Sequence, residues 1–443
     1  MGKYTKKDVL ELIEEEDVEF IRLQFTDIFG VFKNIAITAS QMEKVLDCEF
    51  MFDCSSIAGF NNEELTDMYL YPDIDTFEIF PWRPQQGKVA RLICNLYYSD
   101  RTPLETDPRY ILRKVLKDAE MLGYEFNVGP ECEFFLYHVD DNNNPTTISH
   151  ETAGYFDMAP IDMGENARRD MVLTLEDMGF EIEASHHESA PAQHEIDFKY
   201  GSALEAADNI MTLKLTVKTI AKRHGLHATF MPKPKCDVDG SGMHINMSLS
   251  KEGKNAFVDE TSEDGLSKTA HYFIGGLLKH MKAVTAVANP LVNSYKRLVP
   301  GFEAPVYIGW SMYNRSQVAR IPASRKEETR IELRSPDSTA NPYLVLAVCL
   351  AAGLEGIKKQ IASPEPIVKH IEDMTEAERK AAHIEILPGN LLEAVNELEK
   401  DSFICGVLGK KLVQQYIDAK KEEWKEYTIQ VTSWEIENNL YKY

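Results

Sequence analysis

Six residues of the types that bind divalent cations occur in four separate segments of this chain. They are five carboxylates and one imidazole: Glu131, Glu133, Glu188, Glu195, His244 and Glu332. In each segment polar and apolar residues alternate as in a strand, so the polar residues share one face. Five carboxylates and an imidazole brought to one place would hold two hard divalent cations. The sequence therefore predicts a two-metal site.

The first segment, residues 129–135, carries two of these carboxylates. Glu131 and Glu133 are two positions apart and project from one face of the predicted strand, with Cys132 and Phe134 on the other. Two adjacent carboxylates repel each other unless cations neutralise them. Taken alone, the pattern is also typical of an exposed acidic strand edge, so the metal site depends on agreement with the other segments.

The second segment is a predicted hairpin. Glu188 and Glu195 flank a turn at residues 190–193, which contains a proline. The turn would fold two strands back on each other, so the two carboxylates could meet across the pair. A polar hairpin with a few buried histidines is the alternative interpretation.

The third segment combines glycines with a histidine. His244 follows residues 240–242 and shares its predicted strand face with Asn246 and Ser248. The glycines would let a ligand approach the backbone closely. The stretch is neither a P-loop nor a dinucleotide-binding fingerprint. A single histidine in such a strand can also be structural.

Arginines accompany the last carboxylate. Arg330 and Arg334 share the predicted strand face of Glu332, and Arg315 and Arg320 lie shortly upstream. Arginines beside metal-binding carboxylates suit phosphate and carboxylate recognition, although the same pattern can form a surface ion-pair ladder. Two metals and several arginines without a P-loop predict phosphoryl transfer in which the metals bind the phosphates. A metal-dependent phosphohydrolase is the alternative.

The elements that position these residues belong to a chain of 443 residues, long enough for at least two domains. Residues 1–104 are predicted to form a small β-rich domain. Its expected elements are a helix at 6–16, a hairpin at 19–37 and strands at 77–80 and 88–97. Asp107 and Pro108 then suit the N-cap and first position of a helix that runs to Leu122. The second domain is expected to span 105–443.

The second domain is predicted to interleave strands with long helices. The expected strands are 126–138, 181–188, 194–199, 227–231, 244–249 and 329–334, and the expected helices are 165–178, 203–224, 267–288 and 341–360. From residue 390 the tail is charged and predicted to be helical.

The composition excludes several classes of protein. The net charge of −23 opposes binding to nucleic acid and to anionic lipid. Seven scattered cysteines without a CxxC motif do not form a disulfide framework and favour the reduced cytosol. The N-terminus has no apolar signal core, and the longest apolar run, 344–354, is too short to span a bilayer. A cytoplasmic protein without a membrane or nucleic-acid partner is expected.

These segments, in this order and spacing, resemble glutamine synthetase of the bacterial type I class over essentially the whole chain. The matching stretches are 52–57, 129–135, 183–198, 233–244, 289–300, 314–334 and 341–343, and residues 293–301 are especially specific. The resemblance implies an α+β fold. A small N-terminal β-grasp domain would precede a larger catalytic domain in which helices surround an antiparallel strand funnel.

The resemblance also implies an activity, the ATP-dependent ligation of L-glutamate and ammonia to L-glutamine through a γ-glutamyl phosphate. It assigns Glu133, Glu188 and Glu195 to one metal, and Glu131, His244 and Glu332 to the other. Positions for glutamate or the transferring phosphate are matched by Asp239, Gly240, Arg297, Glu303, Arg315 and Arg334; nucleotide contacts are matched by Glu183, Ser248, Arg315 and Arg320.

Three residues match catalytic positions of the family: Asp53, Glu303 and Arg315. Asp53 of a neighbouring subunit would bind ammonium and take its proton. Glu303 would lie in a flap that shields the acyl phosphate from water, because acyl phosphates hydrolyse.

Cofactors, assembly and regulation follow from the same resemblance. Two or more Mg²⁺ or Mn²⁺ ions per site are implied, with ATP as co-substrate, in a homo-dodecamer of two stacked hexamers with shared sites. Residues 384–388 contain no tyrosine where adenylylated members carry one, which favours the feedback-inhibited, non-adenylylated subtype. Asn62 replaces an arginine of that subtype, so weakened inhibition by glutamine is expected. Nitrogen-responsive transcription regulators are candidate partners by the same analogy.

Four positions depart from the family pattern: Cys54, Ala58, Asp239 and Lys326. Glycine is usual at positions 54 and 326, and asparagine at 239. None of these changes removes a predicted ligand. Two alternatives stay open, a ligase that γ-glutamylates a larger amine and a non-catalytic structural relative. The latter should have lost ligands, and this chain keeps all six.

Overall fold

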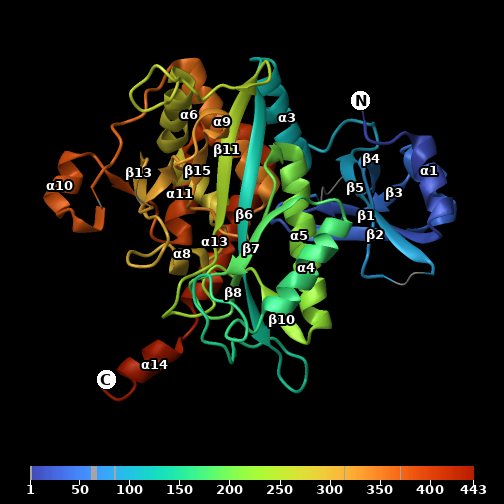
Figure 1. The fold of residues 1–443 in the computed structure, drawn as a ribbon, viewed down its shortest axis with the longest axis horizontal. Helices are drawn as coiled ribbons and strands as arrows, with labels where there is room; N and C mark the ends of the chain where they lie inside the picture. The colour runs from blue at the N-terminus through green and yellow to red at the C-terminus, as the bar shows by residue number, and fades with distance from the viewer. Residues whose placement is uncertain (1, 61–66, 84–85, 314, 370) are drawn as a thin grey trace.

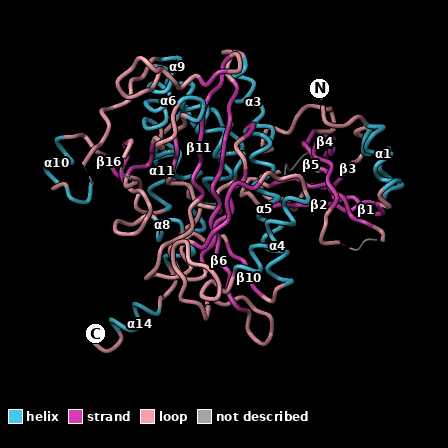
Figure 2. Tube along the Cα trace, viewed as in Figure 1, coloured by secondary structure: helices cyan, strands magenta, loops and turns pink. Residues whose placement is uncertain are grey.

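The computed structural model describes residues 2–60, 67–83, 86–313, 315–369 and 371–443, and its strands form two sheets (Figure 1). The smaller sheet, at the right of Figure 1, belongs to the first hundred residues. The long strands β6 (Glu125–His138) and β11 (Met243–Lys251) run side by side through the larger part. Helices surround this larger sheet, and loops gather at its lower end (Figure 2).

The smaller sheet has five strands in the order β2–β1–β5–β4–β3. They are β1 (Val18–Thr26), β2 (Phe32–Thr38), β3 (Met51–Asp53), β4 (Asp67–Ile79) and β5 (Lys88–Tyr97), accompanied by helices α1 (Lys6–Glu15) and α2 (Met42–Leu46). β1 and β5 are parallel, and the other pairs are antiparallel. The predicted hairpin is confirmed as β1 and β2. β4 begins ten residues before the predicted strand at 77–80, and β3 was not predicted.

The larger sheet follows the order β16–β13–β14–β15–β11–β6–β8–β7, with three short strands beside it. The remaining strands are β7 (Ile182–His187), β8 (Gln193–Phe198), β9 (Gly201–Ser202), β10 (Leu226–Thr229), β12 (Lys254–Asn255), β13 (Tyr307–Ser311), β14 (Gln317–Arg320), β15 (Ile331–Leu333) and β16 (Glu385–Ile386). Its pairs are antiparallel except β13 with β14. The six predicted strands are confirmed, whereas β13 and β14 were not predicted.

The helices confirm the predicted pattern with one correction. They are α3 (Pro108–Glu120), α4 (Glu165–Asp177), α5 (Ala203–Arg223), α6 (Lys268–Lys279), α7 (Met281–Ala288), α8 (Ser294–Arg297), α9 (Pro342–Lys359), α10 (Glu376–Ala381), α11 (Leu391–Lys400), α12 (Ser402–Leu408), α13 (Lys410–Thr428) and α14 (Ser433–Asn439). The single helix predicted at 267–288 is wrong, because the chain breaks at His280. Its ring nitrogens lie 2.6 Å from Glu355 and 2.6 Å from Asp401, which anchors the break.

A buried arginine joins the smaller sheet to helices of the larger part. Arg109 on α3 lies 2.7 Å from Asp73 of β4 and 2.8 Å from Asp208 of α5, and it donates a 2.7 Å hydrogen bond to Asn95 of β5. These charge-assisted contacts fix the smaller sheet against the helices of the larger part.

Alternation along β6 separates the core from the site. Cys132 and Phe134 are fully buried in the apolar core, and α5 packs against this strand. Glu131 and Glu133 therefore project from the opposite face, as their spacing predicts. Among the described residues, no helix combines the length and apolar character needed to cross a membrane.

Candidate active site

All six predicted metal ligands line one cavity of about 210 Å³. Its wall consists of the carboxylates Glu131, Glu133, Glu188, Glu195, Asp197, Asp239, Glu303 and Glu332, the basic residues His244, Arg315, Arg320 and Arg334, and Tyr155, Ser189, Gln193 and Gly240. Carboxylates outnumber arginines in this wall, so the cavity favours cations.

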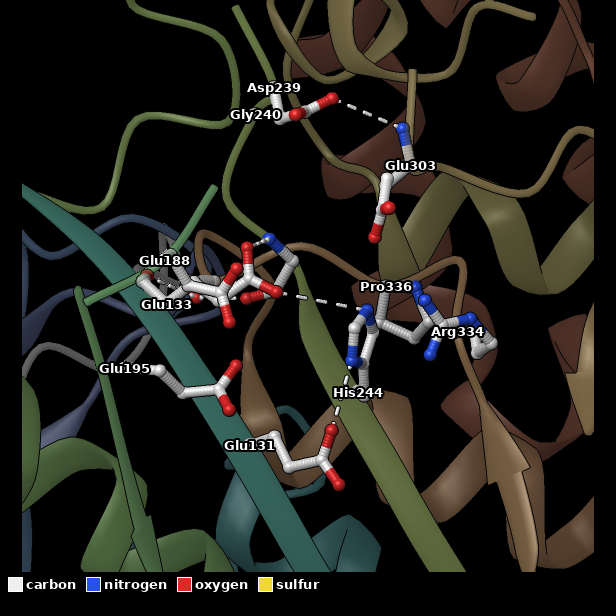
Figure 3. Close-up of polar contacts among 12 residues, drawn as sticks. Glu131, Glu133, Glu188, Glu195, Asp239, Gly240, His244, Glu303, Arg334 and Pro336 are labelled. Carbon is white, nitrogen blue, oxygen red and sulfur yellow. Dashed lines mark hydrogen bonds and ion pairs between the residues drawn. The ribbon is translucent and has the colours of Figure 1, made fainter. Parts of the chain in front are cut away.

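The register of the larger sheet explains why these side chains meet. Glu133 lies opposite Glu195, and Glu131 lies opposite Asp197, in the β6–β8 pair. On the other side of β6, Glu131 lies opposite His244 of β11. Directly opposed side chains on one face are within reach of each other. Figure 3 shows Glu131, Glu133, Glu195 and His244 directed toward one space.

Glu131, His244 and Glu332 form the first group of ligands, with one ligand atom of each within 4.8 Å of the others. His244 Nδ1 lies 3.0 Å from Glu131 Oε2 and 3.9 Å from Glu332 Oε1. His244 Nε2 is buried without a hydrogen-bond partner among the described residues. Burial opposes ionisation of Glu131, but hydrogen bonds from His244 and Asn246 lower its pKa to about 2. An ionised carboxylate beside an unsatisfied imidazole nitrogen fits a divalent cation.

Glu133, Glu188 and Glu195, the ligands predicted for the other cation, line the same cavity. Among the described residues, the second set of ligand atoms within 4.8 Å of one another in this cavity region comes from His186, Glu195 and Asp197. Burial, and then the charge of Glu133, raise the pKa of Glu188 to about 7 and the pKa of Glu195 well above its ordinary value. Burial and the charge of Glu195 raise the pKa of the neighbouring Asp197 to about 9. His186 Nε2, 3.2 Å from Glu195 Oε1, is close but does not offset this repulsion. Carboxylates that repel each other so strongly fit a second divalent cation.

Two arginines converge on Glu332. Arg320 Nη1 lies 2.6 Å from Glu332 Oε2, and Arg334 pairs with the other oxygen. Burial would raise the pKa of Glu332, but Arg334 and then His244 outweigh it and lower the pKa. Guanidinium groups next to metal ligands place positive charge where a phosphate would bind.

Arg297 lies behind the cavity wall. It is 2% exposed, and its guanidinium donates hydrogen bonds to the carbonyls of Ser335 at 2.8 Å and Arg334 at 3.1 Å. It also packs closely against the backbone of the glycine stretch. A Cβ at Gly242 would come within 2.6 Å of its Nη2, so this position favours glycine. Its assigned contact with glutamate stays a prediction.

The segment predicted to form a flap, residues 301–304, contributes Glu303 to the cavity wall. The backbone N–H of Glu303 donates a 3.2 Å hydrogen bond to Asp239 Oδ1, and the Glu303 side chain extends toward the ligands (Figure 3). The Lys233 ammonium lies 3.5 Å from the centre of the Phe302 ring and donates to the carbonyl of Val238. These contacts hold the flap to the loop that precedes Gly240.

A second cavity of about 360 Å³ adjoins the first, since Glu131 and Asp197 line both. Its wall contains Gly129, Pro130, Glu131, Glu183, Ala184, Asp197, Phe198, Tyr200, Asn246, Ser324, Glu327, Glu328, Thr329 and Arg330. Of the predicted nucleotide contacts, Glu183 lies here, whereas Arg315 and Arg320 line the first cavity. Ser248 is buried and pairs with the hydroxyl of Tyr200, and it lines neither of these two cavities.

Asp53, like Arg297 and Ser248, lines neither of the two cavities, and it lies in the smaller sheet. It ends β3 in the smaller sheet and is exposed. Hydrogen bonds with Ser55 lower its pKa, so it is an ionised carboxylate at the surface.

Sequence reasoning missed four residues of the cavity wall: Tyr155, Ser189, Gln193 and Asp197. Asp197 carried a usable signal, because it follows Glu195 by two positions on the same strand and so shares its face. Tyr155 lies in an irregular segment that offers no periodicity.

Strands of the larger sheet bring carboxylates, an imidazole and arginines to one cavity, and a small sheet is joined to this part. This combination defines the class of metal-dependent enzymes that act on phosphates. Residues 105–439 match the family model described as glutamine synthetase, catalytic domain, and residues 17–99 match glutamine synthetase, beta-Grasp domain. The chain therefore belongs to the glutamine synthetase family.

Individual relatives agree along the whole chain. A protein of Clostridium saccharobutylicum named glutamine synthetase is 60% identical over 443 residues, covering 100% of both chains. One of Staphylococcus aureus (strain Mu50 / ATCC 700699) with the same name is 55% identical over 441 residues, covering 99% of both. Among solved structures, a GmaS/ADP complex matches with a TM-score of 0.89 at 33% identity, covering 98% of this chain and 99% of that chain. Plasmodium falciparum glutamine synthetase matches with a TM-score of 0.88 at 27% identity, covering 99% of both.

Proposed function

We propose that this protein ligates L-glutamate and ammonia to L-glutamine with cleavage of ATP to ADP and phosphate. One observation carries the proposal: all six predicted metal ligands line one cavity in a chain that is 60% identical over its full length to a glutamine synthetase. A non-catalytic relative would have no reason to keep five mutually repelling acids around one space.

The chemistry needs an activated carboxylate, because a carboxylate is a poor acyl donor. The γ-carboxylate oxygen of glutamate attacks the γ-phosphorus of ATP, and ADP leaves. Asp53 takes a proton from ammonium, and the nitrogen of the resulting ammonia attacks the acyl carbon of γ-glutamyl phosphate. Phosphate leaves and takes up the second proton that the nitrogen loses. Arg315, Arg320 and Arg334, which line the cavity, are placed to bind the transferring phosphate.

We assign one cation to Glu133, Glu188 and Glu195, and a second to Glu131, His244 and Glu332. Mg²⁺ or Mn²⁺ suits these oxygen-rich donor sets. When bound, such ions neutralise phosphate charge and align the reacting groups. The adjoining cavity with Glu183 is the proposed nucleotide site. The solved GmaS/ADP complex of the same fold supports nucleotide binding by this fold.

The protein's own residues supply water exclusion and proton transfer. The Asp239–Glu303 hydrogen bond and the Lys233–Phe302 contact hold the flap at the cavity wall, which limits hydrolysis of the acyl phosphate. Because Asp53 is exposed and remote, we propose that a neighbouring subunit supplies it, as a dodecamer of two stacked hexamers would allow.

Several finer assignments belong to the same proposal. They are a domain boundary near residue 104, a cytoplasmic location, the non-adenylylated subtype and binding to nitrogen-responsive regulators. The expected weakening of glutamine inhibition concerns Asn62, which lies outside the described residues.

Hydroxylamine tests the reaction directly. Purified protein with glutamate, ATP, Mg²⁺ and hydroxylamine should form γ-glutamyl hydroxamate. Absence of product from an assembled, folded sample would refute the assignment. Putrescine used in preference to ammonia would indicate the larger-amine ligase, and ATP cleavage without glutamate would indicate a phosphohydrolase.

A further inference from the structure

A buried polar cluster lies behind the metal cavity. Glu151, Asp162, His187 and His194 are all buried and offer ligand atoms within 4.8 Å of one another. The guanidinium of Arg168 lies among them, 2.8 Å from Asp162 Oδ2 and 2.8 Å from His194 Nδ1. The cluster thus receives its positive charge from the protein, and a role other than metal binding must explain it.

Glu151 is the member with most connections. Its Oε1 accepts hydrogen bonds from the backbone N–H of Ala192 and, at 2.8 Å, from His187 Nε2, and its Oε2 accepts one from the N–H of Met163 at 2.9 Å. Burial would raise the pKa of Glu151, but these donors outweigh it and lower the pKa. One ionised carboxylate therefore ties its own irregular segment to the loop at Met163, the end of β7 at His187 and the turn at Ala192.

The turn that Glu151 holds is strained. Ala192, between β7 and β8, has φ +71°, a left-handed conformation that costs a residue with a Cβ about 1–2 kcal/mol. Such conformations persist where surrounding contacts impose them. The hydrogen bond from Ala192 to Glu151 is one of these contacts, and the carbonyl of Ala192 accepts another from Leu136 N–H at 2.9 Å.

Two short routes lead from this turn to the metal ligands. Next to Ala192, Gln193 donates a 2.8 Å hydrogen bond to Glu133 Oε2. On the other route, His187 lies between Glu151 and the backbone carbonyl of Glu188, with its Nδ1 2.6 Å from that oxygen. Glu133 is thus linked to Glu151 through Gln193 and Ala192, and Glu188 through His187. The two ligands lie together in Figure 3.

We propose that Glu151 is a positioning residue for the cation assigned to Glu133, Glu188 and Glu195, acting through the strained turn at Ala192 and through His187. This proposal rests on the metal site of the proposed function. Removing one oxygen of Glu151 would free the turn to relax, and Glu133 and Glu188 would lose the alignment that a rigid wall provides.

The test is Mn²⁺ binding to the whole protein, measured by calorimetry or electron paramagnetic resonance without substrates. Glu151→Gln should weaken Mn²⁺ binding about 10- to 100-fold, the range found when residues supporting metal ligands are changed. Glu151→Asp, which keeps the charge but shortens the reach, should weaken it less. Adding Ala192→Gly to Glu151→Gln should restore most of the affinity, because glycine adopts the left-handed turn without strain.

Glu355→Gln is the matched control, because Glu355 is also a buried carboxylate bonded to a histidine but lies outside both cavities. It should leave Mn²⁺ affinity unchanged. Unchanged affinity in Glu151→Gln, an equal loss in Glu355→Gln, or no recovery with Ala192→Gly would each overturn the proposal. A wild-type protein that binds no Mn²⁺ would overturn the metal site itself and this proposal with it, which distinguishes the two failures.

Discussion

Two buried carboxylates in this molecule have opposite surroundings. Glu355 on α9 has Lys279 Nζ at 2.8 Å, His280 Nε2 at 2.6 Å and Lys359 Nζ at 2.5 Å. Burial opposes its ionisation, but these cations lower its pKa to about 2. Burial and neighbouring acids instead raise the pKa of Glu188 in the cavity to about 7.

The difference separates a structural carboxylate from a functional one. A carboxylate that stabilises the fold receives its cations from neighbouring side chains. The cavity leaves negative charge that no neighbouring cationic side chain compensates, so protons or metal cations from solution balance it. This contrast marks the functional site by physics alone, independently of any relative.

The largest effect should come from Glu131, whose side chain lines both cavities. Glu131→Gln removes a negative charge from the donor set and one of the two oxygens that accept from His244 and Asn246, so hydroxamate formation should fall about 100-fold. Thermal unfolding should show that the variant still folds. Full activity in this variant would remove Glu131 from the site.

The structural carboxylate should behave in the opposite way. Glu355→Gln leaves His280 and two lysines without their shared anion, so the free energy of unfolding should fall by roughly 3 kcal/mol. Denaturant unfolding measures this loss, and hydroxamate formation by the folded variant should equal that of the wild type. If the variant were as stable as the wild type, or if the folded variant lost activity, Glu355 would not be a purely structural carboxylate.

The metal-free protein should lose stability as the pH rises. Glu188, with a pKa of about 7, and Asp197, with a pKa of about 9, bind protons more tightly in the folded than in the unfolded chain. Their contribution to the free energy of unfolding therefore decreases from about pH 4 to pH 9. For Glu188 the stability lost is on the order of 3 kcal/mol once the pH is above 7.

Melting temperatures in a chelator between pH 6 and pH 9 test this slope. Mg²⁺ should raise the melting temperature more at pH 8 than at pH 6, because ionised carboxylates bind it better. Glu188→Gln should show a shallower fall with pH than the wild type. A wild-type curve no steeper than that of the variant would contradict the assigned pKa.

The smallest effect concerns backbone strain beside the cavity wall. Lys326, where family members usually carry glycine, is exposed and has φ +61°. Lys326→Gly should raise the free energy of unfolding by no more than about 1 kcal/mol, because glycine removes the strain but loses more entropy on folding. Lys326→Ala keeps the strain and should give no gain, so an equal gain from both would argue against strain.

The sequence predicted the parts of this structure that have strong periodicity. Alternation gave the side-chain directions of Glu131, Glu133 and His244, and the register of β6 with its neighbours brought them together. The resemblance, not the alternation, divided the ligands between two metals. That division stays a prediction.

What could not be predicted depends on contacts between distant segments. β13 and β14 have five and four residues and pair in parallel, so local alternation is too short to reveal them. The break at His280 depends on Asp401, more than a hundred positions away. Glu151 lies in an irregular segment, and only the folded chain brings it to Ala192.

The two cavities share part of their wall, and this has a thermodynamic consequence. A cation that binds to Glu131 or Asp197 changes the potential felt in the adjoining cavity, and a ligand there changes the potential felt by the cation. Linkage makes such coupling reciprocal. The occupancy of each cavity then depends on the supply of both ligands. If the adjoining cavity binds the nucleotide, as proposed, the protein would respond to the balance between free divalent cation and nucleotide in its surroundings.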